Sequence, residues 1–231
     1  MSKKYKAEPL SYRKIERIAM DFLRRYYPDL YLKPGVFPAL DFFESGNFER
    51  ITGFTFEVRD LPDNCDGITI PEKKLCILSN SCYERLERND SRALFSAAHE
   101  LGHVILHALM KGLVFENTKL IELARDHNKK YEDSEWQANA FAASLLMPIH
   151  HIMHFVENQE KFFPLNMEIA WAFGTSLESV RYRLNTYEAK FQHLKSHFGY
   201  KVDFNALLIS NNEKGSPETQ GSPFGTSESE G

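Results

Sequence analysis

The chain has 231 residues and a formal net charge of −4 at pH 7, so it can bury a sizeable core and carries no global positive field that would attract nucleic acid or an anionic membrane. No apolar run approaches the ~20 residues that span a bilayer, and no apolar stretch follows the basic residues near the start, so we expect neither a membrane span nor a signal peptide. Three cysteines without a Cys-x-x-Cys pair predict free thiols in a reduced, cytoplasmic setting.

The first third of the chain predicts helices followed by a small sheet. Leu10 to Tyr27 repeats apolar residues at helical spacing, and Phe37 to Glu44 predicts a short aromatic helix. Ile51 to Val58 is rich in Thr, Phe and Val and predicts a strand. Gly67 to Ile70 and Lys74 to Leu78 predict a hairpin. We therefore expect a small, mainly antiparallel sheet ahead of the next helix, which Asn89-Asp90 would cap at its start.

That next helix carries His-Glu-x-x-His at residues 99–103. Residues four apart lie on one helix face with Cβ atoms roughly 5–6 Å apart, so His99 and His103 can converge on one cation. The other side of the helix is an apolar stripe that would anchor it: Leu94, Ala98, Leu101, Ile105 and Leu109. Neutral imidazole suits zinc, and Glu100, beside the metal face, can take a proton from water.

A zinc site needs a third ligand, and His107 continues the series of histidines. It lies about 12 Å along the helix axis from His99, at roughly 1.5 Å per residue, so one ion could bind both only if the helix broke. The residues between His103 and His107 offer no glycine for such a break. We therefore expect His107 to pack or to support a ligand.

A downstream segment, Ser134 to Pro148, predicts a second helix that starts with a capping box of Ser134 and Gln137. One face combines Glu135 and Asn139 with small apolar residues, which permits close approach to another helix and points the carboxylate inward. A buried carboxylate requires a partner, so Glu135 is the predicted third ligand, and Asn139 would fix a histidine or the carboxylate. The alternative ligands are Asp126, His127, Glu132 and Asp133.

Together, His99-Glu100-Leu101-Gly102-His103 and the later Glu135-x-x-Ala138-Asn139-x-Phe141-Ala142-x-x-Leu145-Leu146-Met147-Pro148 resemble the ImmA/IrrE family of zinc metallopeptidases. Ala172 to Leu184 is similar to that family's closing helix pair. The resemblance implies His99, His103 and Glu135 as metal ligands and Glu100 as the catalytic residue. It also implies a bacterial, phage or mobile-element protease that cleaves, or helps to inactivate, helix-turn-helix repressors and so switches on stress or transfer genes.

Three further segments leave alternatives open. Lys111 to Asp133 is polar and would form a lid over the site or, as we favour, a surface excursion. The histidines that follow the second helix resemble a secondary metal cluster, but we expect a solvated helix continuation: His150, His151 and His154. Met167 to Gly174 and Leu177 to Tyr187 have the spacing of a helix-turn-helix, but acidic residues offset Arg181 and Arg183, which favours structural packing or protein docking over DNA reading.

The sequence thus predicts an α+β, zincin-like metallopeptidase domain with an N-terminal helix over residues 1–160, a helix-turn-helix-like helical subdomain over 161–210 and a disordered tail over 211–231. The predicted function is zinc-dependent cleavage of a protein, expected to be a repressor. The alternative is a non-catalytic zinc-binding regulator that binds DNA or a partner protein. His and carboxylate ligands would also accept Mn²⁺ or Fe²⁺. Neither a membrane nor a nucleic acid is an expected partner.

Overall fold

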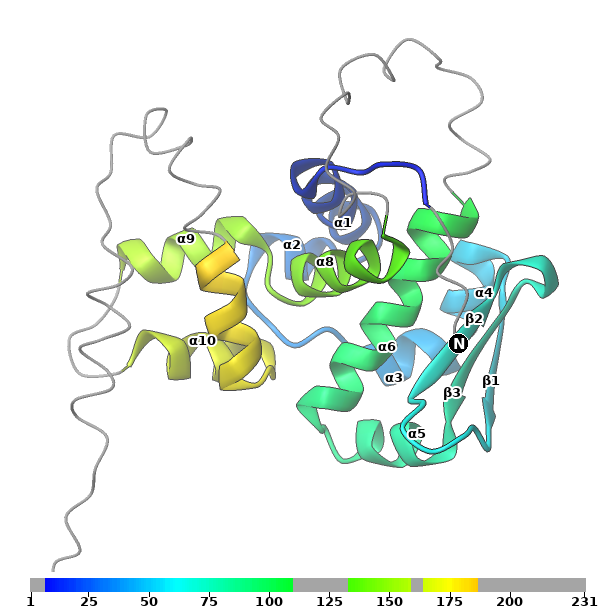
Figure 1. The fold of residues 1–231 in the computed structure, drawn as a ribbon. Helices are drawn as coiled ribbons and strands as arrows, with labels where there is room; N and C mark the ends of the chain where they lie inside the picture. Colours follow the sequence, from blue (N-terminus) through cyan, green and yellow to red (C-terminus); the bar gives the residue numbers. More distant parts are fainter. Residues whose placement is uncertain (1–6, 110–132, 159–163, 187–231) are drawn as a thin grey trace, which may run out of the picture.

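The computed structural model describes residues 7–109, 133–158 and 164–186, and over these residues the fold is mostly helical with one three-stranded sheet. The α+β class predicted from the sequence is therefore confirmed. The sheet lies at one side of the molecule and helices α9 and α10 at the other, with α1, α6 and α8 between them (Figure 1). The elements before the site helix are α1 (Tyr12–Tyr26), α2 (Pro28–Leu32), α3 (Ala39–Glu44), α4 (Asn47–Thr52), β1 (Thr55–Arg59), β2 (Gly67–Ile70), η1 (Pro71–Lys73), β3 (Leu75–Ser79) and α5 (Asn80–Glu87). The later elements are α6 (Ser91–His103), η2 (Val104–Leu109), α8 (Ser134–Leu146), α9 (Ile149–Glu157) and α10 (Leu165–Phe173), followed by helical residues 177–186.

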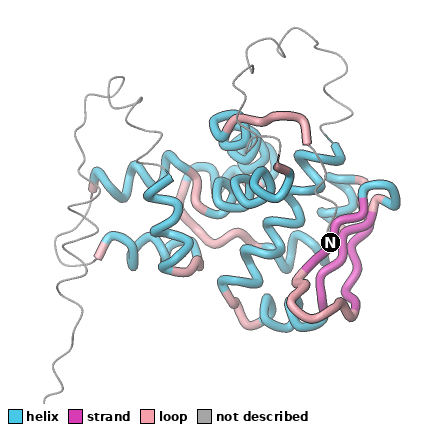
Figure 2. The backbone as a smooth tube through the Cα atoms, viewed as in Figure 1, coloured by secondary structure: helices cyan, strands magenta, loops and turns pink. Residues whose placement is uncertain are grey.

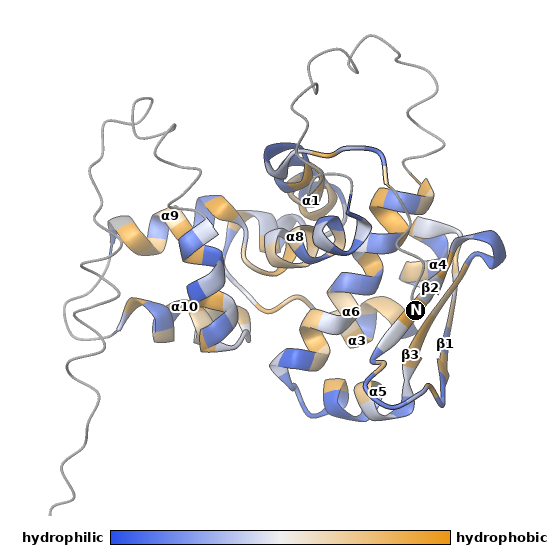
Figure 3. Cartoon of the chain, viewed as in Figure 1, coloured by the Kyte–Doolittle hydropathy of each residue, from blue (hydrophilic) through white to orange (hydrophobic). Residues whose placement is uncertain are grey.

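The sheet has the strand order β1-β3-β2 and is mixed, which corrects the expectation of a mainly antiparallel sheet. The predicted hairpin is present, since β2 pairs antiparallel with β3. The strand β1 does not pair with its neighbour in sequence but lies parallel to β3 on the other side. All five residues of β3 are buried, as expected of a central strand. Figure 2 shows the three strands side by side. Figure 3 shows that β3 is largely apolar, whereas the turn at η1 is hydrophilic.

The helices before the sheet pack around a group of aromatic rings. Phe42 is fully buried at its centre, with its ring centroid 5.9 Å from that of Phe22 and 5.7 Å from that of Phe48. The helix α4 takes Ile51 and Thr52, which the sequence predicted to open a strand. Gly53, with a φ of 68°, ends α4 in a left-handed conformation, so the strand begins only at Thr55.

A second, smaller core forms where α9, α10 and residues 177–186 meet the end of α8. The two helical segments expected in the last part of the chain are present. The hydroxyl of Ser176 accepts from the backbone N–H of Ser179 at 3.1 Å, so Ser176 caps the second of them. The predicted boundary between residues 160 and 161, the excursion at 111–132 and the tail lie outside the described residues.

A buried ion pair fastens this C-terminal part to the first helix. Arg183 is 1% exposed, and its guanidinium donates to both carboxylate oxygens of Glu16 at 2.8 Å and to the carbonyl of Met147. Glu16 also accepts from the hydroxyl of Ser144 at 2.8 Å, and Arg183 contacts the hydroxyl of Tyr12. The sequence treated Arg183 as one of several surface charges, and the structure shows it turned into the protein.

Two of the three histidines of α9, His150 and His151, are used inside the fold, which corrects the expectation of a solvated helix for them, whereas His154 is exposed as expected. Nε2 of His150 lies 2.7 Å from the carbonyl oxygen of Tyr31, and Nε2 of His151 lies 3.0 Å from that of Leu30. Both imidazoles therefore satisfy carbonyls near the end of α2, which have no partner within that short helix. Among the described residues these histidines do not form a metal-binding group. Nor does any helix there combine the length and apolar character needed to cross a membrane.

Replacing Arg183 by methionine should lower the free energy of unfolding by about 3–5 kcal/mol, because it leaves the Glu16 carboxylate buried without its cation. Urea unfolding would measure the loss. Arg181→Met is the matched control, since Arg181 is exposed on the same helix and should change stability little. The double variant Glu16→Gln, Arg183→Met should recover part of the loss. Equal stability of the Arg183 and Arg181 variants would contradict the buried pair.

Candidate metal centre

The site is built on α6, which starts as the sequence predicts. The side chain of Asp90 accepts from the backbone N–H of Ala93 at 2.8 Å and caps the helix. The apolar side of α6 is fully buried: Ala97, Ala98 and Leu101 have no exposed surface. This anchorage fixes the rotation of the helix, so His99 and His103 lie together on the side that faces α8.

A close contact between α6 and α8 sets the distance between the functional residues. A Cβ atom added to Gly102 would lie 3.1 Å from both the Cα and the carbonyl oxygen of Ala138, and 3.2 Å from the ring of Phe141. Only glycine opposite alanine allows the two backbones to approach so closely. Glu135 lies one turn before Ala138, which places its side chain next to His103.

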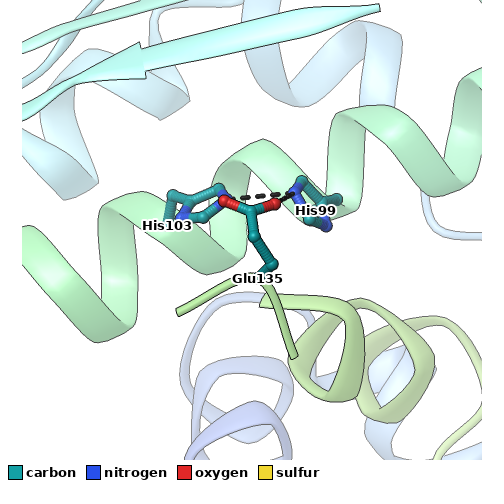
Figure 4. Close-up of side chains that lie close together, drawn as sticks. All are labelled: His99, His103 and Glu135. Carbon is teal, nitrogen blue, oxygen red and sulfur yellow. Dashed lines mark hydrogen bonds and ion pairs between the residues drawn. The ribbon is translucent and has the colours of Figure 1, made fainter. Parts of the chain in front are cut away.

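His99, His103 and Glu135 are the group of potential metal ligands that the structure brings together among the described residues, with their ligand atoms all within 4.8 Å of one another. The carboxylate of Glu135 reaches from α8 toward both imidazole rings (Figure 4). The two Nε2 atoms lie 3.0 Å apart, and the carboxylate oxygens lie 3.4 Å from Nε2 of His99 and 3.5 Å from Nε2 of His103.

These separations fit a zinc ion. Ligand atoms at roughly 2.0–2.1 Å from a tetrahedral zinc lie about 3.3 Å from one another. Two imidazole nitrogens and a carboxylate are also the donor set of a catalytic zinc, which keeps one position open. The side chain of Glu135 is 62% exposed rather than buried as expected, whereas those of His99 and His103 are 17% exposed. The group therefore lies at the edge of the two helices, with the carboxylate partly exposed to solvent.

The outer nitrogens of both rings also have partners. Nδ1 of His99 lies 2.9 Å from Oδ1 of Asn139, and Nδ1 of His103 lies 3.0 Å from Nδ1 of His107. The sequence expected both supporting residues. His107 does not belong to the group of three; it follows in the π-helical η2, behind His103.

The short distances between these side chains shift the pKa values of Glu135 and His99. Hydrogen bonds from His103 and His99 hold the pKa of Glu135 well below its ordinary value. Burial disfavours the charged form of His99, but its contact with Glu135 and the nearby Glu100 outweigh burial and raise its pKa. In the absence of an ion, a proton is thus drawn to the place where these side chains meet, and a cation would replace it.

Glu100 lies apart from the three and faces the sheet. It is 6% exposed, and its Oε2 accepts from the hydroxyl of Thr69 on β2 at 2.7 Å. A Cβ atom on Gly67 would lie 2.6 Å from Cγ of Glu100, so the carboxylate side chain packs directly on the strand backbone. Burial raises the pKa of Glu100, although His99 and the hydrogen bond from Thr69 oppose this shift.

Sequence reasoning missed Thr69 and Gly67. The available signal was the alternation of the strand, which places residues 67 and 69 on one face. The predicted capping box is wrong, because Asp133 caps α8 and accepts from the backbone N–H of Glu135 at 3.0 Å. Asp133 is thereby engaged at the helix end and is not one of the three grouped side chains. The other alternative ligands, at 126, 127 and 132, lie outside the described residues.

Comparison with known proteins identifies the domain. Residues 85–185 match the family model of the M78 peptidases, described as the IrrE N-terminal-like domain. The chain contains an IrrE N-terminal-like domain. The family predicted from the sequence is thus confirmed, and the IrrE-like domain includes all four predicted site residues: His99, Glu100, His103 and Glu135. Its family is one of peptidases, and Gly67 and Thr69 precede the matched residues.

A solved structure described as a "Mycobacterium tuberculosis transcriptional regulator" is similar to the chain with 18% sequence identity and a TM-score of 0.46. The similarity covers 74% of this chain and 55% of the regulator, so the chain with its IrrE-like domain spans about half the length of that protein. No curated protein matches the chain significantly.

Replacing Gly102 by valine should force α6 and α8 apart and lower the free energy of unfolding by about 1–3 kcal/mol, as overpacking typically does. Gly102→Ala should cost less, because alanine is smaller and gains about 1 kcal/mol of helix propensity over glycine. Thermal unfolding of both variants beside the wild type measures the effect. A valine variant as stable as the wild type would show that the helices are not held at this distance.

Proposed function

We propose that the protein is a zinc-dependent endopeptidase in which His99, His103 and Glu135 hold the metal and Glu100 acts as the general base. The observation that carries this proposal is the group of three ligand atoms 3.0–3.5 Å apart, next to a separate buried carboxylate. A site that only stored or sensed zinc would not need the fourth residue. The peptidase family of the matched domain supports the same reaction.

Zinc supplies Lewis-acid chemistry, which makes water more acidic and a carbonyl more reactive toward it. Glu100 is not a metal ligand in this proposal and supplies the base for the reaction from the side of the sheet. Its hydrogen bond from Thr69 occupies Oε2 and fixes the side chain. No described residue donates a hydrogen bond to Oε1, so this oxygen is available to accept the proton of an attacking water and pass it to the leaving amine. Burial favours this role, because a raised pKa makes the carboxylate a better proton acceptor.

A protein substrate also suits the sheet next to Glu100. The strand β2 is at an edge of the sheet, and its Thr69 contacts Glu100 directly. Within the described residues no strand pairs with the outer side of β2. An extended peptide that added to this edge would gain main-chain hydrogen bonds and pass beside the metal ligands. This mode requires a segment without secondary structure of its own, such as a linker or a loop.

We infer further that the substrate is a helix-turn-helix repressor, whose cleavage would derepress stress or mobile-element genes in the cytoplasm. The support is the resemblance of the sequence motifs to the ImmA/IrrE family and the match of residues 85–185 to the IrrE N-terminal-like domain, which carries the site. Cys65, Cys76 and Cys82 are all free thiols, which agrees with a reducing compartment. The metal is zinc on this proposal, with Mn²⁺ and Fe²⁺ as the ions that the same ligands would also accept.

The alternative function, a regulator that binds DNA or a partner without cleavage, has less support. Its DNA-binding form would use the second helix of the C-terminal pair, at residues 177–186. Arg183 of that helix is buried against Glu16 and is not available to a phosphate. Arg181 remains exposed there but has Glu178 on the same helix, so the helix lacks the basic face that DNA reading needs.

Replacing Glu135 by alanine should remove one of three ligands, so zinc should be lost on dialysis against a chelator concentration that the wild type tolerates. Elemental analysis measures the metal per chain, with one ion expected for the wild type. Glu84→Ala is the control, since this carboxylate is exposed on α5 and far from the ligands in the sequence. Wild-type zinc content in the Glu135 variant would move the third ligand elsewhere.

The deciding experiment for catalysis is Glu100→Gln. Glutamine keeps the size of the side chain and an acceptor for Thr69 but removes the base, so the rate of cleavage should fall by ~10²–10⁴-fold while zinc content stays at one ion per chain. The protein to be tested as substrate is a helix-turn-helix repressor encoded beside this chain, and a chelator-treated wild type shows which cleavage depends on the metal. A folded, zinc-loaded variant that cuts at the wild-type rate would falsify the proposed mechanism. Relief of repression without any cleavage would instead favour the regulator.

A further inference from the structure

Behind His103 lies a chain of hydrogen bonds that ends at the backbone before the first helix. Nδ1 of His103 is 3.0 Å from Nδ1 of His107, and Nε2 of His107 is 3.0 Å from Oε1 of Gln137. The amide nitrogen of Gln137 then donates to the carbonyl oxygen of Glu8 at 2.8 Å. Gln137 is fully buried, and the chain joins α6, η2, α8 and the segment ahead of α1.

The direction of each bond follows from its last acceptor. A backbone carbonyl can only accept, so the amide nitrogen of Gln137 must face Glu8, and its oxygen must face His107. An amide oxygen also only accepts, so Nε2 of His107 carries a hydrogen. Neutral His107 then has a lone pair on Nδ1, and the hydrogen of that contact belongs to Nδ1 of His103. As a result, when a cation displaces the proton that His103 shares with Glu135, Nε2 of His103 is left with a lone pair directed toward His99 and Glu135.

We propose that Gln137 and His107 are positioning residues that fix the tautomer and the ring orientation of His103, so that it binds the metal through Nε2. This inference rests on the proposed metal site and explains why His103 would bind the ion through Nε2 rather than through Nδ1. His99 reaches the same state by a shorter route, because Oδ1 of Asn139 accepts from its Nδ1 at 2.9 Å. Two lone pairs and a carboxylate oxygen thus converge, an arrangement that a cation satisfies.

The backbone supports this role. His107 lies in the π-helix η2, directly after α6. π-Helical turns are rare in proteins overall, and those that occur are often found at functional sites. Its ring centroid is 5.1 Å from that of His103, with the ring planes 52° apart. Because the last acceptor belongs to Glu8, the metal site is connected to the N-terminal segment, which the matched family domain does not include. Zinc affinity should therefore depend on residues far from the ligands.

The test measures the zinc affinity of the full chain by competition with a chromophoric chelator. His107→Phe and Gln137→Leu break the chain at different links and should each weaken zinc binding by about 10–100-fold, as loss of a partner behind a ligating histidine typically does. His107→Gln is the conservative variant. A glutamine at 107 can still accept from His103 and donate to Gln137, so it should recover most of the affinity.

A second measurement separates positioning from stability. The visible spectrum of the Co²⁺-loaded protein reports the geometry around the ion, and it should change in His107→Phe and Gln137→Leu but not in His107→Gln. Thermal unfolding of the metal-free proteins identifies any variant that does not fold, in which case its counterpart at the other link decides. His154→Phe, on an exposed part of α9, is the control.

Wild-type affinity and an unchanged Co²⁺ spectrum in folded His107→Phe or Gln137→Leu would overturn the inference. Equal losses in the conservative and the disruptive variants would also overturn it, because a purely steric role would then explain the effect. These results differ from a failure of the proposed function, in which the wild type itself would bind no zinc or would bind zinc without cleaving protein.

Discussion

The closeness of α6 and α8 is the constraint on which the candidate metal centre depends. Two histidines four residues apart on a helix are a local feature, but the carboxylate comes from a different helix and must arrive within a few ångströms of both rings. The absence of a side chain at Gly102 favours this approach, because a Cβ atom there would lie only 3.1 Å from the backbone of Ala138. The small residues at this contact therefore contribute to the geometry of the site without being ligands.

The site also depends on parts of the chain that lie outside the matched family domain at 85–185. Glu100 is held by Thr69 on the edge strand and packs on the backbone of Gly67. The N-terminal segment accepts the last hydrogen bond behind His103, and α1 receives Arg183 from the C-terminal helices. The sheet and the segment ahead of the first helix thus support residues of the site from outside the matched domain. A fragment cut to the limits of the family match would keep the ligands but lose these supports.

Features that depend on neighbours in the sequence could be predicted, and those that depend on distant contacts could not. The sequence indicated His99, His103 and Glu135, which the structure groups together, and the helix cap at Asp90, because spacing along a helix and capping chemistry are local. It placed Asn139 beside a ligand for the same reason.

Nothing in the sequence indicated that Thr69 would meet Glu100 or that Arg183 would be buried, since the partners of both lie far away in the chain. His150 and His151 were expected in solvent because nothing local shows that α2 would present its carbonyls to them. The parallel pairing of β1 with β3 was missed because it joins strands that are not consecutive.

The ion pair between Glu16 and Arg183 has a consequence for the order in which the protein is made. Its two residues are separated by 167 positions, so a chain that grows from its N-terminus carries Glu16 for most of its synthesis without the cation that neutralises it. The first helix can collapse early onto the aromatic residues that follow it, but its packing against α8 and α9 brings a carboxylate into an interior that is not yet complete. Contacts of such sequence separation form late, because the entropy of closing a long loop must be overcome first. The metal ligands come from the middle of the chain, whereas the arginine that neutralises Glu16 comes from the last described helix.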